Sequence, residues 1–462
     1  MEKIGVPLPK EGLLARYDRP VPRYTSYPTA PHFRHPASQS VVRKLLRGIP
    51  EDQSVSFYIH IPFCRHLCLY CGCHTRILSH EGPVREYLET VCQEISLAAA
   101  AIGRRQKVSH IHFGGGTPNF ALTDDLGDLL NVIGQKFTLS DTLVIAMEMD
   151  PRLLTRRKAQ KLVKLGVSRV SLGVQDFQPD VQKAVGRIQS HEHVRDCVGW
   201  FREEGIGGIN FDMIYGLPFQ TPEKIGDNVR KLGEMRPERV AFFGYAHVPW
   251  FKEHQKRLEV YDLPDAAARF RMSETARRDL MEQGYVPVGI DHFAVPEDAL
   301  ALALKEKRLR RNFQGYAADG GDVLIAFGQT AISGYGNAYT QNTDRNREYR
   351  DRVGAGEFPV VKACLLSPED IYRRSVIESI MCYGEVDLKS AGCDARPWAC
   401  GVWESARQRL AACESDGLVE LGNMTVSITP AGRPFTRIVA GVFDAYLLQQ
   451  AAQGAPRHAR AV

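Results

Sequence analysis

The strongest constraint on the fold is a regular alternation of short apolar runs with longer stretches of helical spacing, beginning near residue 55. Runs rich in β-branched and aromatic residues predict six strands, at residues 55–61, 108–113, 143–149, 168–174, 209–214 and 239–245. Helices are predicted between them at residues 83–101, 122–136, 152–165, 179–204 and 221–235. This alternation implies parallel strands joined by right-handed crossovers. The fold class is therefore α/β, as an open doubly wound sheet or a partial (β/α)6 barrel.

Residues with chemical functions stand where these predicted strands end. They are the cysteine loop after the first strand, the GGGTP segment at residues 114–118, Glu148, Gln175, Asp212 and Ala246–His247. Parallel α/β sheets bind their ligands beyond the carboxyl ends of the strands. We expect these residues to converge on one face of the sheet.

Four of the eleven cysteines lie within ten residues, at Cys64, Cys68, Cys71 and Cys73. The first three have the spacing C-x3-C-x2-C. Three thiolates on one tight loop suit three corners of an iron–sulfur cube, whose fourth iron then stays open for catalysis. Two alternatives remain: a zinc site completed by His74 or a distant histidine, and a redox pair of Cys68 with Cys71.

The composition limits the possible partners. Hydrophobic residues make up 44% of the 462 residues, which is ample for a large core. No apolar run approaches the roughly 18 residues of a membrane span, and no signal peptide is recognised at residues 1–20. The net charge of +5 is weak support for a polyanionic partner, and the basic runs at residues 155–164 and 305–311 are typical of solvated helix faces. We expect a cytoplasmic monomer with no membrane span and no nucleic-acid partner.

Four regions are predicted along the chain. Residues 1–50 form an arm that packs on the body, residues 51–250 the α/β core, residues 251–368 a barrel extension and linker, and residues 369–462 a mostly helical unit. One strand is expected at residues 285–293. The last region has the order of a winged helix: helices at 369–384 and 402–417, a hairpin at 419–429 and a terminal helix. Few basic residues lie in its second helix, so packing against the barrel is a better interpretation than DNA binding.

The C-x3-C-x2-C loop after a first strand resembles the radical S-adenosylmethionine superfamily, and GGGTP resembles its methionine-binding strand. The resemblance implies a partial (β/α)6 barrel with a [4Fe–4S] cluster held by Cys64, Cys68 and Cys71. It also implies that the open iron binds the amine and carboxylate of S-adenosylmethionine. One electron then cleaves the cofactor to methionine and a 5′-deoxyadenosyl radical.

A closer resemblance is to the oxygen-independent coproporphyrinogen III dehydrogenase family of the haem pathway. It rests on PRYTSYPTA at residues 22–30, CGC at 71–73, RNFQGY at 311–316 and further segments along nearly all the chain. The resemblance implies that Tyr58, Gly115, Glu148 and Ile332 contact the S-adenosylmethionine on the cluster. It implies a second S-adenosylmethionine site lined by Tyr70, Gly116, Thr117, Gln175, Arg187, Asp212 and Ala246. Gln314 is expected near the site, and Tyr58 with the three cluster cysteines forms the expected catalytic set.

The implied reaction is the oxidative decarboxylation of two propionates of a tetracarboxylate porphyrinogen to vinyls, with an electron donor and an acceptor that the sequence does not identify. Arg23, Arg187 and Arg311 are candidates to bind the carboxylates, because guanidinium pairs with carboxylate in a bidentate fashion. Three other functions remain open. They are a paralogue that uses the same radical for methyl transfer or haem-ring opening, a haem-binding chaperone, and a nucleic-acid-modifying radical enzyme.

Overall fold

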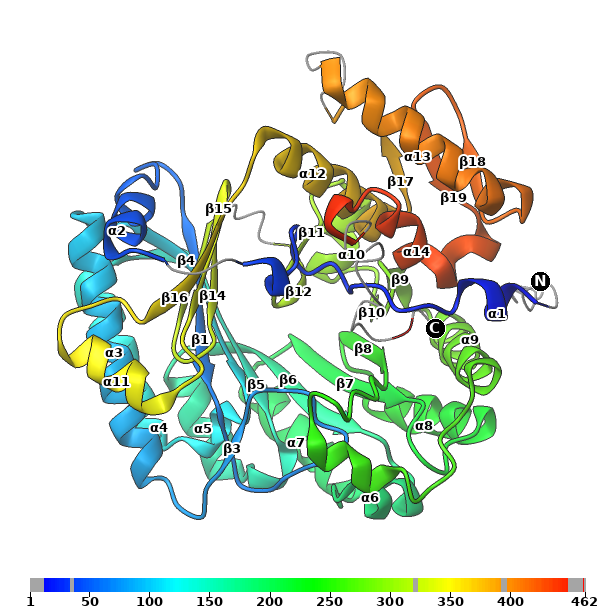
Figure 1. Cartoon of the computed structure of the whole chain (residues 1–462). Coiled ribbons are helices and arrows are strands. Elements are labelled where there is room, and N and C mark those ends of the chain that lie inside the picture. Colours follow the sequence, from blue (N-terminus) through cyan, green and yellow to red (C-terminus); the bar gives the residue numbers. More distant parts are fainter. Residues whose placement is uncertain (1–11, 34–36, 319–322, 392–396, 448–459, 461–462) are drawn as a thin grey trace.

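The computed structural model describes residues 12–33, 37–318, 323–391, 397–447 and 460. Its centre is a curved twelve-stranded sheet with helices on its outer side (Figure 1). Six strands lie side by side in chain order and run parallel: β1 (Val55–Ile61), β4 (Lys107–Gly115), β5 (Thr138–Met149), β6 (Val167–Gln175), β7 (Ile209–Tyr215) and β8 (Arg239–Gly244). The predicted partial (β/α)6 barrel is thus confirmed.

The crossover helices lie where they are predicted, with one exception. They are α3 (Gly82–Ile102), α4 (Thr123–Lys136), α5 (Arg156–Lys164), α6 (Pro179–Val185), α7 (His191–Glu203) and α8 (Pro222–Met235). The single helix predicted at residues 179–204 is wrong, because two helices occupy this range. Gly186 ends α6 with a left-handed φ of 69°, and the Ser190 side chain caps α7 by accepting from the backbone N–H of His193. The break turns the chain so that Arg187 lies beneath the cysteine loop.

Further strands extend the sheet at both edges. β13 (Val323–Phe327) runs parallel to β1 and is followed outward by the antiparallel strands β14 (Ile332–Tyr335), β15 (Ala338–Asn342) and β16 (Val360–Leu365). At the other edge, β10 (His292–Ala294) pairs with β8, and β9 (Val286–Val288) pairs with β10. The single strand predicted at residues 285–293 is therefore wrong. Gly289 turns the chain there with a φ of 61°, and a Cβ on it would overlap the ring of Tyr316, so any larger residue would have to displace that ring.

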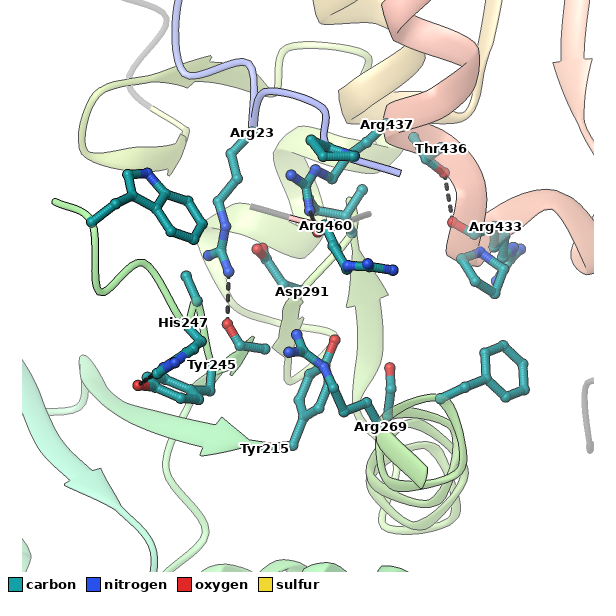
Figure 2. Close-up of a pocket in the computed structure, with 18 residues that line it drawn as sticks. Arg23, Tyr215, Tyr245, His247, Arg269, Asp291, Arg433, Thr436, Arg437 and Arg460 are labelled. Atoms are coloured by element: carbon teal, nitrogen blue, oxygen red, sulfur yellow. Dashed lines mark hydrogen bonds between the residues drawn. The ribbon is translucent and has the colours of Figure 1, made fainter. Parts of the chain in front are cut away.

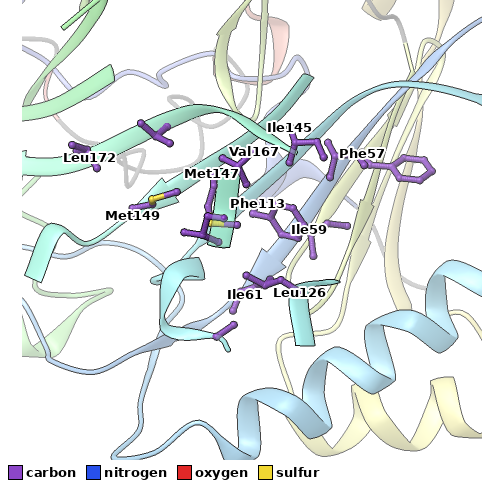
Figure 3. Close-up of a cluster of buried hydrophobic side chains, with 14 of the residues drawn as sticks. Phe57, Ile59, Ile61, Phe113, Leu126, Ile145, Met147, Met149, Val167 and Leu172 are labelled. Atoms are coloured by element: carbon purple, nitrogen blue, oxygen red, sulfur yellow. The ribbon is translucent and has the colours of Figure 1, made fainter. Parts of the chain in front are cut away.

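Alternation along the parallel strands separates the core from the site. Phe57, Ile59, Phe113, Met147 and Leu172 point toward the helices and are buried (Figure 3). Burying side chains of this size stabilises the fold by roughly 1.5–3 kcal/mol each. Because successive residues of a strand face opposite sides, the intervening polar residues point into the barrel. The interior face therefore carries the chemically active side chains.

The C-terminal residues form a second hydrophobic core. It is built from α12 (Pro368–Tyr383), α13 (Pro397–Ser415), α14 (Thr436–Gly441) and a small sheet of β17 (Glu385–Asp387), β19 (Thr425–Ile428) and β18 (Val419–Leu421). The predicted helices and hairpin are present, and β17 is an addition. Together with α1 (Leu13–Tyr17), the segment up to Tyr27 packs into this core, and Tyr24 donates to Asp444 at 3.0 Å.

The stretch predicted as one arm packs in two places. Its first part packs on the C-terminal unit, whereas α2 (Gln39–Arg47) packs on α3 and on the barrel core. The described segment before residue 34 crosses from the C-terminal unit to the barrel mouth (Figure 1). Among the helices that the structure describes, none is long and apolar enough to cross a membrane. The proposed boundaries between the four regions stay a prediction.

Candidate active site

The cysteine loop follows β1 and is closed by a short parallel pair, β2 (Phe63–Cys64) with β3 (Arg76–Ile77). Thr117 Oγ1 donates to the Sγ of Cys64 at 3.2 Å. A Cβ on Gly116 would lie 2.8 Å from the carbonyl oxygen of Phe63 and 3.0 Å from that sulfur. The predicted GGGTP segment is therefore packed directly on the loop, and a glycine is required at this point of contact.

A segment after β8 holds the backbone of the loop. Gln255 Nε2 donates to the carbonyl oxygen of Tyr70 at 2.8 Å, and a ring nitrogen of His254 lies 2.8 Å from that of Cys71. Lys252 donates to the carbonyl oxygen of Cys73 at 2.7 Å. Three side chains thus fix the loop from outside the six-strand core. The sequence analysis missed them because no motif marks residues so far from the cysteines.

The sulfur of Cys68 faces two guanidinium groups. Arg187 Nη1 lies 3.4 Å from it and Arg152 Nη2 lies 3.7 Å from it. Asp150 pairs with both arginines, at 3.4 Å to Arg187 and 2.7 Å to Arg152, and Arg187 also donates to the carbonyl oxygen of Gly173 at 2.6 Å. Positive charge and N–H donors at a sulfur stabilise a thiolate or a reduced cluster.

Glu148 lies at the carboxyl end of β5, where its side chain faces the barrel interior. His112 Nε2 lies 3.1 Å from its Oε1, and the backbone N–H of Gly115 donates to its Oε2 at 3.1 Å. Burial alone would raise the pKa of Glu148, but these two interactions lower it below its ordinary value. The group is therefore a fixed anion, and 40% of its side chain stays exposed to a ligand.

Two residues predicted for the second cofactor site, Gln175 and Asp212, lie on the neighbouring strands β6 and β7. Asp212 accepts from Ser171 at 2.8 Å and from Asn210 at 2.9 Å. Burial, followed by the charge of Glu148, raises the pKa of Asp212. Gln175 ends β6 with a φ of 70°, an unusual backbone for a residue with a side chain.

Gly173 joins this group to the buried arginine. A Cβ on Gly173 would lie 2.9 Å from both Gln175 Nε2 and Arg187 Nη2. The absence of a side chain at residue 173 therefore lets the amide and the guanidinium meet under the mouth of the barrel. Tyr70 approaches Arg187 from the cysteine loop.

The remaining predicted residues lie around this centre. Tyr58 on β1 stacks on His112 at 5.7 Å between ring centroids, and its hydroxyl lies 3.1 Å from His60 Nδ1. Ile332 begins β14, and Gln314 stands in the turn between β11 (Arg310–Asn312) and β12 (Gly315–Ala317). Ala246 follows β8 and lines a separate pocket. The predicted roles of Ile332, Gln314 and Ala246 stay predictions.

The donor set suits an iron–sulfur cube better than a single ion. In the described part of the chain, no three His, Cys, Asp or Glu side chains form a group that could hold a metal ion. The thiolates of a cube each contact a separate iron, so they need not converge on one point. Three thiols on one loop, with guanidinium groups at one of them and apolar neighbours such as Phe63, fit the cube.

Comparison with known proteins agrees with this geometry. Residues 58–232 match the model of the Radical SAM superfamily. The fold and the thiol loop thus define a radical S-adenosylmethionine protein, a class that implies a [4Fe–4S] cluster and S-adenosylmethionine.

Full-length relatives narrow the class. The oxygen-independent coproporphyrinogen III oxidase of Bradyrhizobium diazoefficiens is 43% identical over 444 residues, covering 96% of this chain and 97% of the relative. That of Paracoccus denitrificans is 38% identical, covering 94% and 96%. The structure of the coproporphyrinogen III oxidase of Escherichia coli superposes with a TM-score of 0.87 at 33% identity, covering 92% of this chain and 98% of that one. The chain belongs to the family of oxygen-independent coproporphyrinogen III oxidases.

Proposed function

We propose that the protein converts coproporphyrinogen III to protoporphyrinogen IX by oxidative decarboxylation of two propionates to vinyls, without oxygen. One observation carries the proposal: a three-thiol loop packed on Gly116, with Cys68 Sγ between two guanidinium groups, in a chain similar over its length to enzymes named for this reaction. Cys64, Cys68 and Cys71 would hold the cluster. The protein would work as a cytoplasmic monomer, with an electron donor and acceptor still to be identified.

When bound, the cluster and S-adenosylmethionine supply a 5′-deoxyadenosyl radical, which takes a hydrogen atom from the carbon β to a carboxylate, so that carbon dioxide and one electron leave and a vinyl remains. Tyr58, Gly115, Glu148 and Ile332 would hold the S-adenosylmethionine at the cluster. The anionic Glu148 can accept hydrogen bonds from ribose hydroxyls.

We further propose a second S-adenosylmethionine, next to the first. It would lie against Tyr70, Gly116, Thr117, Gln175, Arg187, Asp212 and Ala246, with Gln314 near the site. The mutual approach of Gln175 and Arg187 at Gly173, and the nearby carboxylate of Asp212, support such a site. The described segment 12–33 would help to exclude water from the mouth of the barrel.

The test is anaerobic turnover of coproporphyrinogen III by reconstituted protein with S-adenosylmethionine and a reductant. Protoporphyrinogen and 5′-deoxyadenosine are expected together, and both should disappear in Cys68→Ala. Cys92→Ala, on α3 and outside the loop, is the matched control and should keep both products.

Other results would lead elsewhere. Deoxyadenosine without protoporphyrinogen would contradict the substrate and favour another radical reaction. Neither product, together with a new Soret band on adding haem, would favour a haem-binding protein instead.

A further inference from the structure

A pocket of about 480 Å³ lies beside the proposed second cofactor site and shares Ala246 with it; the ends of β7 and β8, the helix α9 (Ala266–Glu282), the N-terminal segment and the C-terminal unit surround it. Its described lining includes the five arginines Arg23, Arg269, Arg433, Arg437 and Arg460. Asp291 is the one acidic residue among those described lining residues. Figure 2 shows the side chains of Arg23, Arg269 and Asp291 around a common space.

The positive charge of this pocket is only partly balanced within the protein, since Arg460 pairs with Asp18 at 3.2 Å. Asp291 is engaged by its neighbour His292, whose Nδ1 lies 2.7 Å away. Arg269 forms no ion pair among the residues that the structure describes, and its buried Nε has no hydrogen-bond partner. Arg23 donates one N–H to the carbonyl oxygen of Gly244 at 2.8 Å, and this acceptor is neutral. A buried N–H without a partner, such as the Nε of Arg269, is costly, and an anionic ligand would satisfy it.

Another arginine of the lining, Arg437, shows that positive charges lie close together in this pocket. Arg437 is buried and donates to the carbonyl oxygens of Pro22 and Arg460, at 3.2 and 2.9 Å. Burial and, next, the charge of Arg23 lower the pKa of Arg437 to about 9. Like charges are thus held together before any ligand arrives.

The rest of the lining is apolar or aromatic. Tyr215, Tyr245 and Phe270 form walls, and Trp250 is 56% exposed at the rim next to Phe251, which is 72% exposed. A second cavity of about 230 Å³ shares Tyr215 and Asp291 and continues along a mixed lining that includes Phe242, Phe293 and Met381 but also Glu274 and Arg277. Arginines set among flat apolar surfaces suit an anion attached to a large apolar body more than a free inorganic anion.

Hydrogen bonds link the segment that lines the pocket to the cysteine loop. Tyr245, Ala246 and His247 line the pocket, and the backbone N–H of Val248 donates to Gln255 Oε1 at 2.6 Å. The amide of Gln255 in turn donates to the carbonyl oxygen of Tyr70 in the loop, at 2.8 Å. A ligand seated in the pocket therefore lies one short segment away from the loop.

We propose that Arg269, with Arg23 and Arg433, binds the carboxylates of the two propionates that the reaction leaves intact. The inference rests on the proposed function, since it assumes a tetracarboxylate substrate. Of the arginines expected from the sequence, Arg23 lines this pocket, whereas Arg187 is committed to Cys68 and Asp150. Bidentate guanidinium–carboxylate pairs here hold the unreactive side of the macrocycle and leave its other side toward the strand ends.

The test measures binding of coproporphyrin III, the oxidised and unreactive tetracarboxylate, to the reconstituted protein by fluorescence. Arg269→Gln should weaken binding at least about tenfold, as expected for loss of a charged hydrogen bond. Arg269→Lys should recover part of the affinity, because lysine keeps the charge but not the fork. Arg271→Gln, an exposed arginine on the same helix, is the matched control and should bind like the wild type. The tetramethyl ester should bind the wild type as weakly as the acid binds Arg269→Gln.

A folded Arg269→Gln variant with wild-type affinity would overturn the proposal, as would an ester that binds as tightly as the acid. If Arg269→Gln does not fold, the exposed Arg433 replaces it as Arg433→Gln, and the ester comparison decides in either case. Turnover separates the two proposals. Arginine-dependent binding without formation of protoporphyrinogen would contradict the proposed function alone. Turnover with an unchanged KM in Arg269→Gln would contradict the pocket assignment alone.

Discussion

The guanidinium of Arg187 lies 3.4 Å from the sulfur of Cys68, although 119 residues separate them in the sequence. The contact exists because Gly186 ends α6 and directs the chain beneath the cysteine loop. A single helix through this range would have carried Arg187 past the loop. The interruption of one helix thus sets the electrostatic environment of one predicted cluster ligand.

Arg187→Gln removes a charged donor from the sulfur of Cys68 and one partner from Asp150. Hydrogen bonds to the sulfurs raise the potential of an iron–sulfur cluster, so we expect a more negative reduction potential, measured by a titration followed by electron paramagnetic resonance. Breaking a buried ion pair should also cost about 3 kcal/mol of unfolding free energy. Arg195→Gln, exposed on α7, is the control, and an unchanged potential in Arg187→Gln would refute the role of this contact.

Cys73 can be separated from the three predicted ligands by substitution. The backbone N–H of Cys73 donates to Cys71 Sγ at 3.4 Å, and alanine retains this donor although it removes the Cys73 thiol, which also lies beside Cys71. Cys73→Ala should therefore keep a full complement of iron and sulfide, while Cys71→Ala should lose the cluster. Iron analysis and visible absorbance after anaerobic reconstitution give the answer. Loss of iron in Cys73→Ala would show that the fourth cysteine is a ligand.

Glu148→Gln should weaken S-adenosylmethionine binding about tenfold, because it removes the charge that accepts hydrogen bonds from the cofactor. The lowered pKa keeps Glu148 ionised at every pH above its ordinary range, so its contribution should be lost only as the pH falls below about 4.5. Equilibrium dialysis at several pH values measures both effects. Glu89→Gln, exposed on α3, should bind normally, and equal affinity in Glu148→Gln would argue against contact with the cofactor.

The buried Glu94 should make the free energy of unfolding depend on pH, independently of the active site. Its carboxyl group is buried and accepts from the Gly328 N–H at 2.8 Å and from Tyr349 at 2.6 Å, yet burial raises its pKa to about 7. Between pH 4.5 and 7 the unfolded chain releases this proton while the folded chain keeps it. Stability should therefore fall as the pH rises through this range, by about 3 kcal/mol.

Glu94→Gln cannot titrate, so its stability should lack this part of the slope although its hydrogen bonds are fewer. Thermal midpoints of both proteins at pH 5.5 and 7.5 make the comparison, because other titrating groups affect both proteins alike. Parallel slopes would mean that Glu94 is ionised throughout.

The sequence predicts the barrel well because each strand is a local pattern. Apolar alternation places β1 at Val55–Ile61 as observed, and the other five parallel strands overlap their predicted ranges. The prediction fails where structure depends on distant contacts. β13 joins the sheet beside β1 only through tertiary pairing. β5 begins at Thr138, five residues before its predicted start, because the first half of the strand is mostly exposed and lacks an apolar pattern.

The candidate site likewise contains residues that the local sequence predicts and residues that only the fold brings together. The three cysteines and GGGTP are recognisable because their spacing is local, and Glu148 is recognisable because a carboxylate interrupts an apolar run. His112, Arg152 and the segment that reaches Tyr70 from Gln255 are not, since only the fold brings them to the loop. The arginine pocket is the extreme case, because its lining comes from stretches spread along the chain from Pro20 to Arg460.

The walls of that pocket are synthesised at very different times. Arg433 and Arg437 are translated long after Cys68, roughly 20 to 70 s later at ordinary rates of synthesis. During this interval the N-terminal segment has no C-terminal core on which to pack, because Tyr24 and its neighbours need the residues around Asp444. The nascent barrel is therefore uncovered while its cysteine loop is already made. The N-terminal segment can therefore cover the mouth of the barrel only after the C-terminal residues have been made.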